Sequence, residues 1–82
     1  MGYHKATIPK GVLGETSKIR EELAELEDAH ERGVRVLCLC EVADLVGSIE
    51  AYLERHFPGF SLEDALMMSN LTRQAFREGA RT

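Results

Sequence analysis

Apolar residues recur at the spacing of an α-helix in three segments of the chain. The first extends from residue 14 or 15 to about 32, and its stripe includes Ile19, Leu23 and Leu26. The second, from about 34 to 56, is apolar almost all the way round the helix. The third, from 61 to about 78, opens with Ser-Leu-Glu-Asp, which is close to a helix-capping box. The pattern predicts an all-α fold.

Glycine and proline divide these segments. Gly33 separates the first two, and Pro58 with Gly59 cannot comfortably continue the second helix. Residues 1–13 show no sustained periodicity and are predicted to form an extended N-terminal arm. We expect a helical core over residues 14–79, made of an antiparallel helical hairpin followed by a C-terminal helix.

The length of 82 residues predicts one domain, covering residues 1–82. So small a domain buries only about 60–65% of the surface of its unfolded chain, so its core is marginal when it stands alone. A second helix that is apolar on most sides has too few partners within one chain. We therefore expect an oligomeric helical bundle, as a homodimer or a tetramer.

Composition excludes several classes of partner. The net charge of −4 argues against nucleic-acid binding, which needs a basic surface. No apolar run approaches the roughly 18 residues that span a bilayer, so no membrane partner is expected. Cys38 and Cys40 lie in an apolar segment, two residues apart, and we expect them to be buried, reduced thiols. These features favour a cytoplasmic protein.

Six acidic residues fall between Glu21 and Glu31. Most charge-rich helix faces are simply solvated, and Glu27 and Asp28 fit that interpretation. Glu22 and Glu25, however, are three residues apart and lie at the margin of the apolar stripe. A carboxylate at the edge of a core loses water and needs compensation, which a cation can supply. The alternatives are a solvated face and half of a metal site.

A second acidic pair favours the metal site. Glu41 and Asp44 are again three apart, in the most hydrophobic segment of the chain. Glu25 and Glu41 each lie eight residues from Gly33, about 12 Å along a helix, so a hairpin can bring the two pairs together. Four converging carboxylates form a hard oxygen site that suits Mg²⁺, or Mn²⁺, rather than zinc.

The two motifs, Glu21-Glu22-x-x-Glu25 and Glu41-x-x-Asp44, resemble those of the MazG-type, all-α nucleoside triphosphate pyrophosphohydrolases, and most of all small MazG-like proteins encoded by phages. The resemblance implies that Glu22, Glu25, Glu41 and Asp44 bind Mg²⁺. It further implies catalytic roles for Glu22, as a ligand, and for Glu21, as an acid behind the ligands or a base that orients water.

The same resemblance implies hydrolysis of (d)NTPs to a nucleoside monophosphate and pyrophosphate, in the control of nucleotide pools. The last helix of the family carries Lys, Asn and Arg at fixed spacing, and here Asn70 and Arg73 match while Leu66 replaces the lysine. Independently of the family, Asn70, Arg73 and Arg77 project within about 60° of one another. We expect these three to contact the phosphates.

Arg77, Lys10 or Lys18 could take the place of the missing lysine, or the substrate could differ. Lys10 lies in a glycine-containing segment before a helix N-terminus, where an anion is favoured. Leu66 also supports an alternative function, a non-catalytic helical module that binds a host protein or a nucleotide without turnover.

Overall fold

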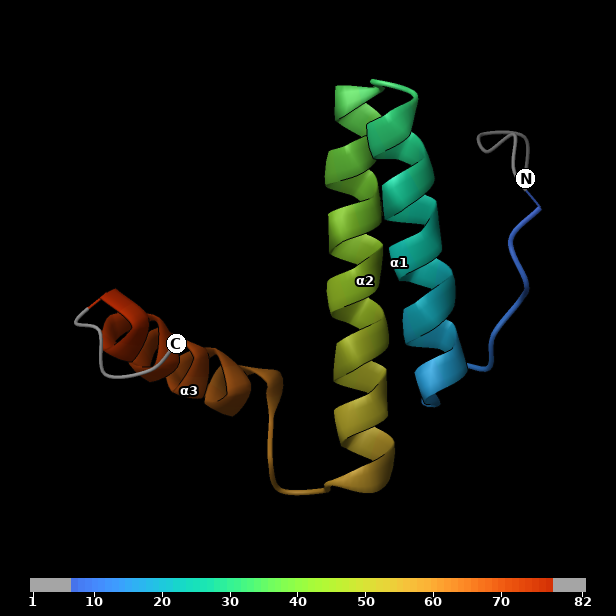
Figure 1. Ribbon diagram of the computed structural model, residues 1–82. Helices are drawn as coiled ribbons and strands as arrows, with labels where there is room; N and C mark the ends of the chain where they lie inside the picture. Colours follow the sequence, from blue (N-terminus) through green and yellow to red (C-terminus); the bar gives the residue numbers. More distant parts are fainter. Residues whose placement is uncertain (1–6, 78–82) are drawn as a thin grey trace.

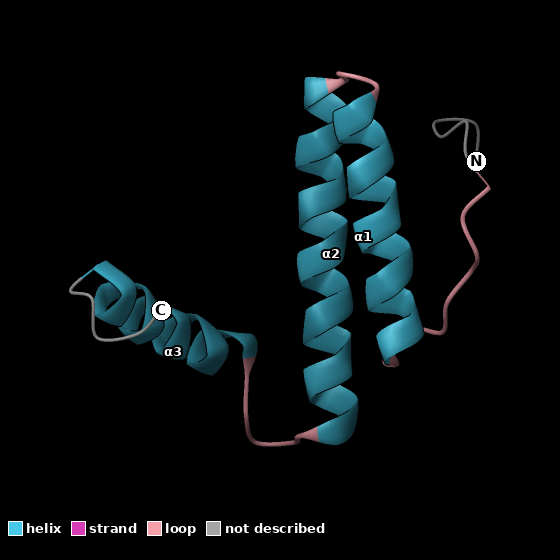
Figure 2. Cartoon of the chain, viewed as in Figure 1, coloured by secondary structure: helices cyan, strands magenta, loops and turns pink. Residues whose placement is uncertain are grey.

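The computed structural model describes residues 7–77, and it contains three helices joined by short connections (Figures 1 and 2). They are α1 (Thr16–Glu31), α2 (Arg35–His56) and α3 (Leu62–Arg77). No strand occurs between residues 7 and 77, so the prediction of an all-α fold is confirmed for this part of the chain. Residues 1–6 of the predicted arm and the expected end of the third helix at 78–79 lie outside the described residues.

The connection between α1 and α2 depends on Gly33. Its φ of 73° lies in the left-handed region, where a side chain is strained. Its amide donates to the carbonyl of His30, and the amide of Val34 donates to that of Ala29. The chain thereby reverses direction, and α2 returns alongside α1 (Figure 1). This reversal brings the acidic segments of the two helices into contact.

The opposite ends of α1 and α2 are joined by side chains. The carboxylate of Glu15, just before α1, lies 3.0 Å from Nε of Arg55 and 3.7 Å from Nε2 of His56. The same His56 nitrogen lies 3.0 Å from the carbonyl oxygen of Gly14. The pairing of α1 with α2 is therefore fixed at both ends.

The third helix begins with the predicted capping box. The Ser61 hydroxyl accepts from the amide of Asp64 at 3.2 Å, and the Asp64 carboxylate accepts from the Ser61 amide at 2.9 Å. As described, α3 contacts α2 but not α1, and it extends away from the pair (Figures 1 and 2). None of its described side chains is buried.

The interior of the single chain is polar. Among the described residues, Ala29 is the only buried hydrophobic side chain, whereas Glu21, Glu22, Glu41 and Ser48 are all 5% exposed or less. In contrast, Val36 and Leu39 on α2 are 75% and 73% exposed. The expectation that both cysteines are buried is wrong: Cys40 is exposed and Cys38 is only half-buried, because one chain does not cover every face of α2.

Within residues 7–77, none of the helices combines the length and the apolar character needed to cross a bilayer.

Candidate metal centre

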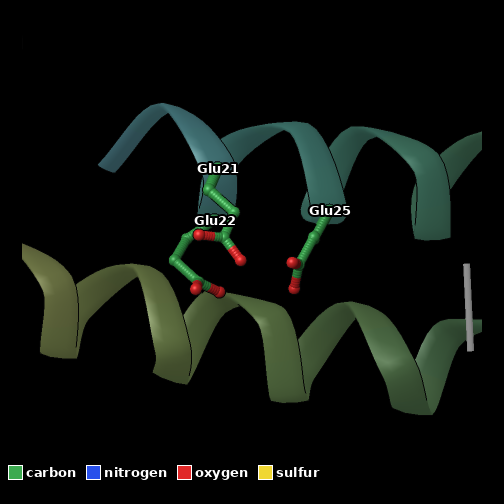
Figure 3. Close-up of side chains that lie close together, drawn as sticks. All are labelled: Glu21, Glu22 and Glu25. Atoms are coloured by element: carbon green, nitrogen blue, oxygen red, sulfur yellow. The ribbon is translucent and has the colours of Figure 1, made fainter. Parts of the chain in front are cut away.

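Two acidic residues of α1, Glu22 and Glu25, lie on its α2-facing side. Glu22 and Glu25 are about one turn apart, and Figure 3 shows their side chains extending toward the ribbon of α2, with Glu21 close by. From α2, Glu41 is buried and Asp44 is exposed. Side chains three residues apart lie on the same face of a helix. Glu22 and Glu25 therefore share one face of α1, and Glu41 and Asp44 share one face of α2.

Two overlapping groups of carboxylates result. In one, Glu21, Glu22 and Glu25 offer oxygens that lie within 4.8 Å of one another; in the other, Glu22, Glu41 and Asp44 do the same. Glu22 belongs to both groups. The structure thus brings together the four residues predicted to bind the metal, which come from both helices.

Glu22 is the member whose surroundings most clearly call for a cation. Its Oε2 lies 3.0 Å from Nζ of Lys18, one turn earlier on α1. Within the described part of the chain, its buried Oε1 has no hydrogen-bond partner. A buried carboxylate oxygen left without a partner costs free energy. An all-oxygen set that contains such an atom fits Mg²⁺ or Mn²⁺ and offers no thiolate or imidazole to zinc.

Glu25 shows the electrostatic cost of the cluster. Burial raises the pKa of its carboxyl group to about 7, and the neighbouring charges of Glu22 and Glu41 act in the same direction. A proton can therefore stay on Glu25 near neutral pH, where an isolated glutamate would be ionised. A bound divalent cation would displace this proton, since a metal-ligating carboxylate must be ionised.

Glu21 has a different environment from the other three acids. Its Oε1 accepts the amide of Gly11 at 2.8 Å and lies 3.2 Å from Nζ of Lys18, while Oε2 lies 3.8 Å from Nζ of Lys10. The hydrogen bond from Gly11 is the main reason that the pKa of Glu21 is lowered. Hydrogen bonds to Glu22 and Glu21 raise the pKa of Lys18, opposed by its partial burial. The two lysines predicted to contact phosphate thus lie beside acidic residues.

A hollow of about 470 Å³ opens beside the cluster. Its walls are formed by Leu13, Lys18, Glu22, Ala43, Asp44, Gly47 and Ser48. Ser48 was not among the predicted site residues. It is buried, and its hydroxyl donates to the carbonyl of Leu45 at 2.7 Å. The sequence does offer an indication, because Gly47 and Ser48 are small residues in an apolar helix, with Ser48 one turn after Asp44.

The structure does not place the predicted residues of α3 in this cluster. Arg73 donates through Nη2 to Oδ1 of Asn70 at 2.6 Å, and both side chains are exposed, as is Arg77. Leu66 is exposed as well. Since α3 extends away from α1 and α2, these side chains and the carboxylates occupy separate parts of one chain (Figure 1).

No protein-family model matches this chain, and searches of curated proteins and of solved structures likewise found no match. The carboxylate geometry and the spacing of the two acidic motifs are therefore what support a function.

Proposed function

We propose that this chain is a Mg²⁺-dependent nucleotide pyrophosphohydrolase that converts (d)NTPs to (d)NMPs and pyrophosphate, with Mn²⁺ as an alternative metal, in the control of nucleotide pools. The observation that carries the proposal is the burial of Glu22 and Glu41 between α1 and α2, within 4.8 Å of Asp44, with one oxygen of Glu22 unpartnered in the described chain. The resemblance of both acidic motifs to MazG-type enzymes supplies the reaction.

Electrostatics supports a cation at this position. Like charges at this separation repel, and burial removes the water that would screen them. Lys18 offsets part of the charge at Glu22, but among residues 7–77 no ion pair does so for Asp44, which opens to solvent. Glu22, Glu25, Glu41 and Asp44 would hold the metal. When bound there, Mg²⁺ supplies the positive charge that neutralises phosphate oxygens and acidifies water.

The hollow beside the cluster fits the phosphate end of a nucleotide. Lys18 provides a positive charge on its wall, and Gly47 provides space, since nothing lies within 4 Å of a Cβ built there. A phosphate in the hollow would have Lys18, Glu22 and Asp44 on its walls, and Glu22 and Asp44 are two of the residues that would hold the metal. Phosphoryl chemistry depends mainly on such positioning and charge neutralisation.

A second copy of the chain completes the site in this proposal. Asn70 and Arg73 lie on a helix that does not reach the carboxylates of its own chain, although their exposed amide and guanidinium groups suit phosphate. Exposed apolar residues beside them, including Met67 and Leu71, favour burial against another subunit. We therefore propose a homodimer or tetramer in which α3 of one copy faces the carboxylates of another.

The direct test is an assay of the purified protein against a panel of dNTPs, NTPs and guanosine polyphosphates, with and without Mg²⁺. We expect release of pyrophosphate that requires the metal and stops on addition of EDTA. Release of single phosphates instead would contradict cleavage between the α- and β-phosphates. Complete lack of turnover by a well-folded protein would contradict the enzyme proposal.

The second candidate function is a non-catalytic helical module that binds a protein or a nucleotide. One observation favours it: Leu66, where the family has a phosphate-binding lysine, is 56% exposed and lies next to exposed Met67 on α3. Nucleotide binding without turnover in the same assay, or assembly with a protein partner through α3, would support this candidate.

A further inference from the structure

The described part of the N-terminal arm is attached to the first turns of α1. The amide of Gly11 donates to Glu21 Oε1 at 2.8 Å, and the amide of Val12 donates to the hydroxyl of Ser17 at 3.0 Å. A Cβ added at Gly11 would clash with the carbonyl oxygen of Ser17. Only glycine therefore allows the arm to approach α1 this closely.

The carboxylate of Glu21 is engaged on both oxygens. Oε1 accepts from the arm and also lies 3.2 Å from Nζ of Lys18, and Oε2 lies 3.8 Å from Nζ of Lys10. Its side chain is only 3% exposed. A general base needs an oxygen that can reach a water molecule and take its proton. Because both oxygens of Glu21 already contact the arm or a lysine, Glu21 is better suited to anchoring the arm than to acting as a general base.

The arm connects this anchor to the candidate site. Leu13, two residues after Gly11, forms part of the wall of the hollow that also contains Glu22 and Asp44. Lys18, the second partner of Glu21, lies on the same wall. Releasing Gly11 would leave the contacts of Val12 with Ser17 and Glu15 to hold the segment that leads into Leu13. Loss of Glu21 would also remove an ion pair of Lys18. The charge of the hollow thus depends on Glu21, and its shape depends on Glu21 in part.

We propose that Glu21 is a positioning residue that fastens the arm at Gly11 and so sets the Leu13–Lys18 wall of the substrate hollow. The consequence for catalysis rests on the proposed function, whereas the attachment of the arm is a property of the free protein. Glu21 then controls how tightly the nucleotide binds, and the chemical step is left to the other carboxylates.

Two chemically unrelated substitutions test this anchor. Glu21→Ala removes the acceptor, and Gly11→Ala keeps the acceptor but forces the arm away from Ser17. In both variants, amide hydrogen exchange in the 11–13 segment of the free protein should become faster by about tenfold, the effect of losing one charge-assisted hydrogen bond. Glu27→Ala, an exposed acid on the same helix, is the matched control and should leave exchange in this segment unchanged.

Steady-state kinetics separates an anchor from a base. For an anchor, Glu21→Ala and Gly11→Ala should both raise KM by about tenfold with kcat nearly unchanged, and Glu21→Gln should recover much of the loss, because its amide oxygen can still accept from Gly11. If Glu21 were the general base, Glu21→Gln and Glu21→Ala would both reduce kcat to background, whereas Gly11→Ala would leave kcat unchanged.

Each outcome is decisive for one of the two proposals. Unchanged exchange in both Glu21→Ala and Gly11→Ala, with helicity retained by circular dichroism, would overturn the anchor. Loss of kcat in Glu21→Gln with a normal arm would likewise overturn it and assign Glu21 to catalysis or metal binding. Inactive wild-type protein would reject the proposed function, while the exchange measurement would still decide the role of Glu21.

Discussion

Glu22 and Glu41 are among the most buried residues of the described chain. Ionisable residues are rarely buried to this degree without a compensating partner. They face each other across the contact of α1 with α2, so neither can regain water without separating the helices. Such an arrangement costs stability in the absence of a cation. At the scale of single residues, the chain thus combines a weakened helix contact with a concentration of negative charge.

Removing one of these charges should separate binding from folding. Glu41→Gln keeps the shape of the side chain but removes a ligand charge and relieves repulsion with Glu25. We expect loss of Mg²⁺-dependent pyrophosphate release, by at least about a hundredfold, together with a melting temperature no lower than that of the unaltered protein. Glu50→Gln, an exposed position on the same helix, is the control and should retain activity. Full activity of Glu41→Gln would reject the metal-site assignment.

The raised pKa of Glu25 predicts how metal binding depends on pH. Its pKa is about 7 in the folded chain against an ordinary 4.5, so its contribution to stability is complete below pH 4.5 and is lost as pH rises through 7. The metal-free protein should therefore lose stability between pH 5 and 8. Mg²⁺ requires the ionised carboxylate, so its stabilising effect should grow over the same interval.

Differential scanning calorimetry with and without Mg²⁺ measures this effect. At about 100 times its dissociation constant, the metal should raise the melting temperature by on the order of 10 °C at pH 8. The increase at pH 5.5 should be clearly smaller. Glu25→Gln should flatten the pH dependence of the metal-free protein. Equal shifts at both pH values would contradict the assignment of Glu25.

At the scale of elements, the reversal at Gly33 determines which acidic residues meet. Its left-handed φ fixes the turn after α1, and the register of α2 against α1 follows from it. The hydrophobic contribution to this pairing comes mainly from half-buried side chains such as Leu26 and Leu45, because Ala29 is the only fully buried hydrophobic residue in the described chain. The turn and the Glu15 contacts at the other end add polar contacts that help to fix the register of the two helices.

Two glycine substitutions should have opposite effects on stability. Gly33→Ala places a side chain at a φ of 73° and should lower the free energy of unfolding by about 1 kcal/mol. Gly47→Ala lies inside α2 with nothing within 4 Å of the new Cβ, so it should raise that energy by up to about 1 kcal/mol. Urea unfolding followed by circular dichroism measures both. A Gly33→Ala protein as stable as the original would show that the turn is not required.

At the scale of the whole molecule, the apolar surface exceeds what one chain can cover. Val36, Leu39, Val42 and Val46 follow one another at steps of three or four residues along α2, and all are exposed. Further exposed apolar side chains occupy α3. A stripe of this length on a helix is typical of an interface. This surface is the physical basis for the oligomer in the proposed function.

A charge in the stripe should therefore change the assembly. Leu39, at 73% exposure in the single chain, should tolerate glutamate if the chain is a monomer, because the new charge would stay in water. In an oligomer, Leu39→Glu would bury a charge and should shift the mass found by sedimentation to that of a smaller assembly. A monomeric unaltered protein at micromolar concentration would contradict the oligomer.

Local patterns in the sequence were sufficient for the helices and for the composition of the acidic cluster. Periodicity located α1, α2 and α3 to within one or two residues at their described ends, and Ser61 with Asp64 forms the predicted cap. The spacing of Glu22 with Glu25 and of Glu41 with Asp44 indicated two pairs on facing sides. These properties depend on residues three or four apart, which a helix always places together.

Only the tertiary structure decided where each acidic side chain is held and what surrounds it. The contact of Glu21 with Gly11 joins residues ten apart, and the hollow joins Leu13 to Ser48, so no helical period could reveal either. The position of α3, away from the carboxylates, is likewise set by the loop at Pro58 and Gly59 rather than by its own sequence pattern. The sequence by itself determined the three helices and the two acidic pairs, because these are local. Only tertiary packing distinguished Glu21, which binds the arm, from Glu22 and Glu41, which face one another. Burial and contact partners are properties of the folded chain and cannot be read from local spacing.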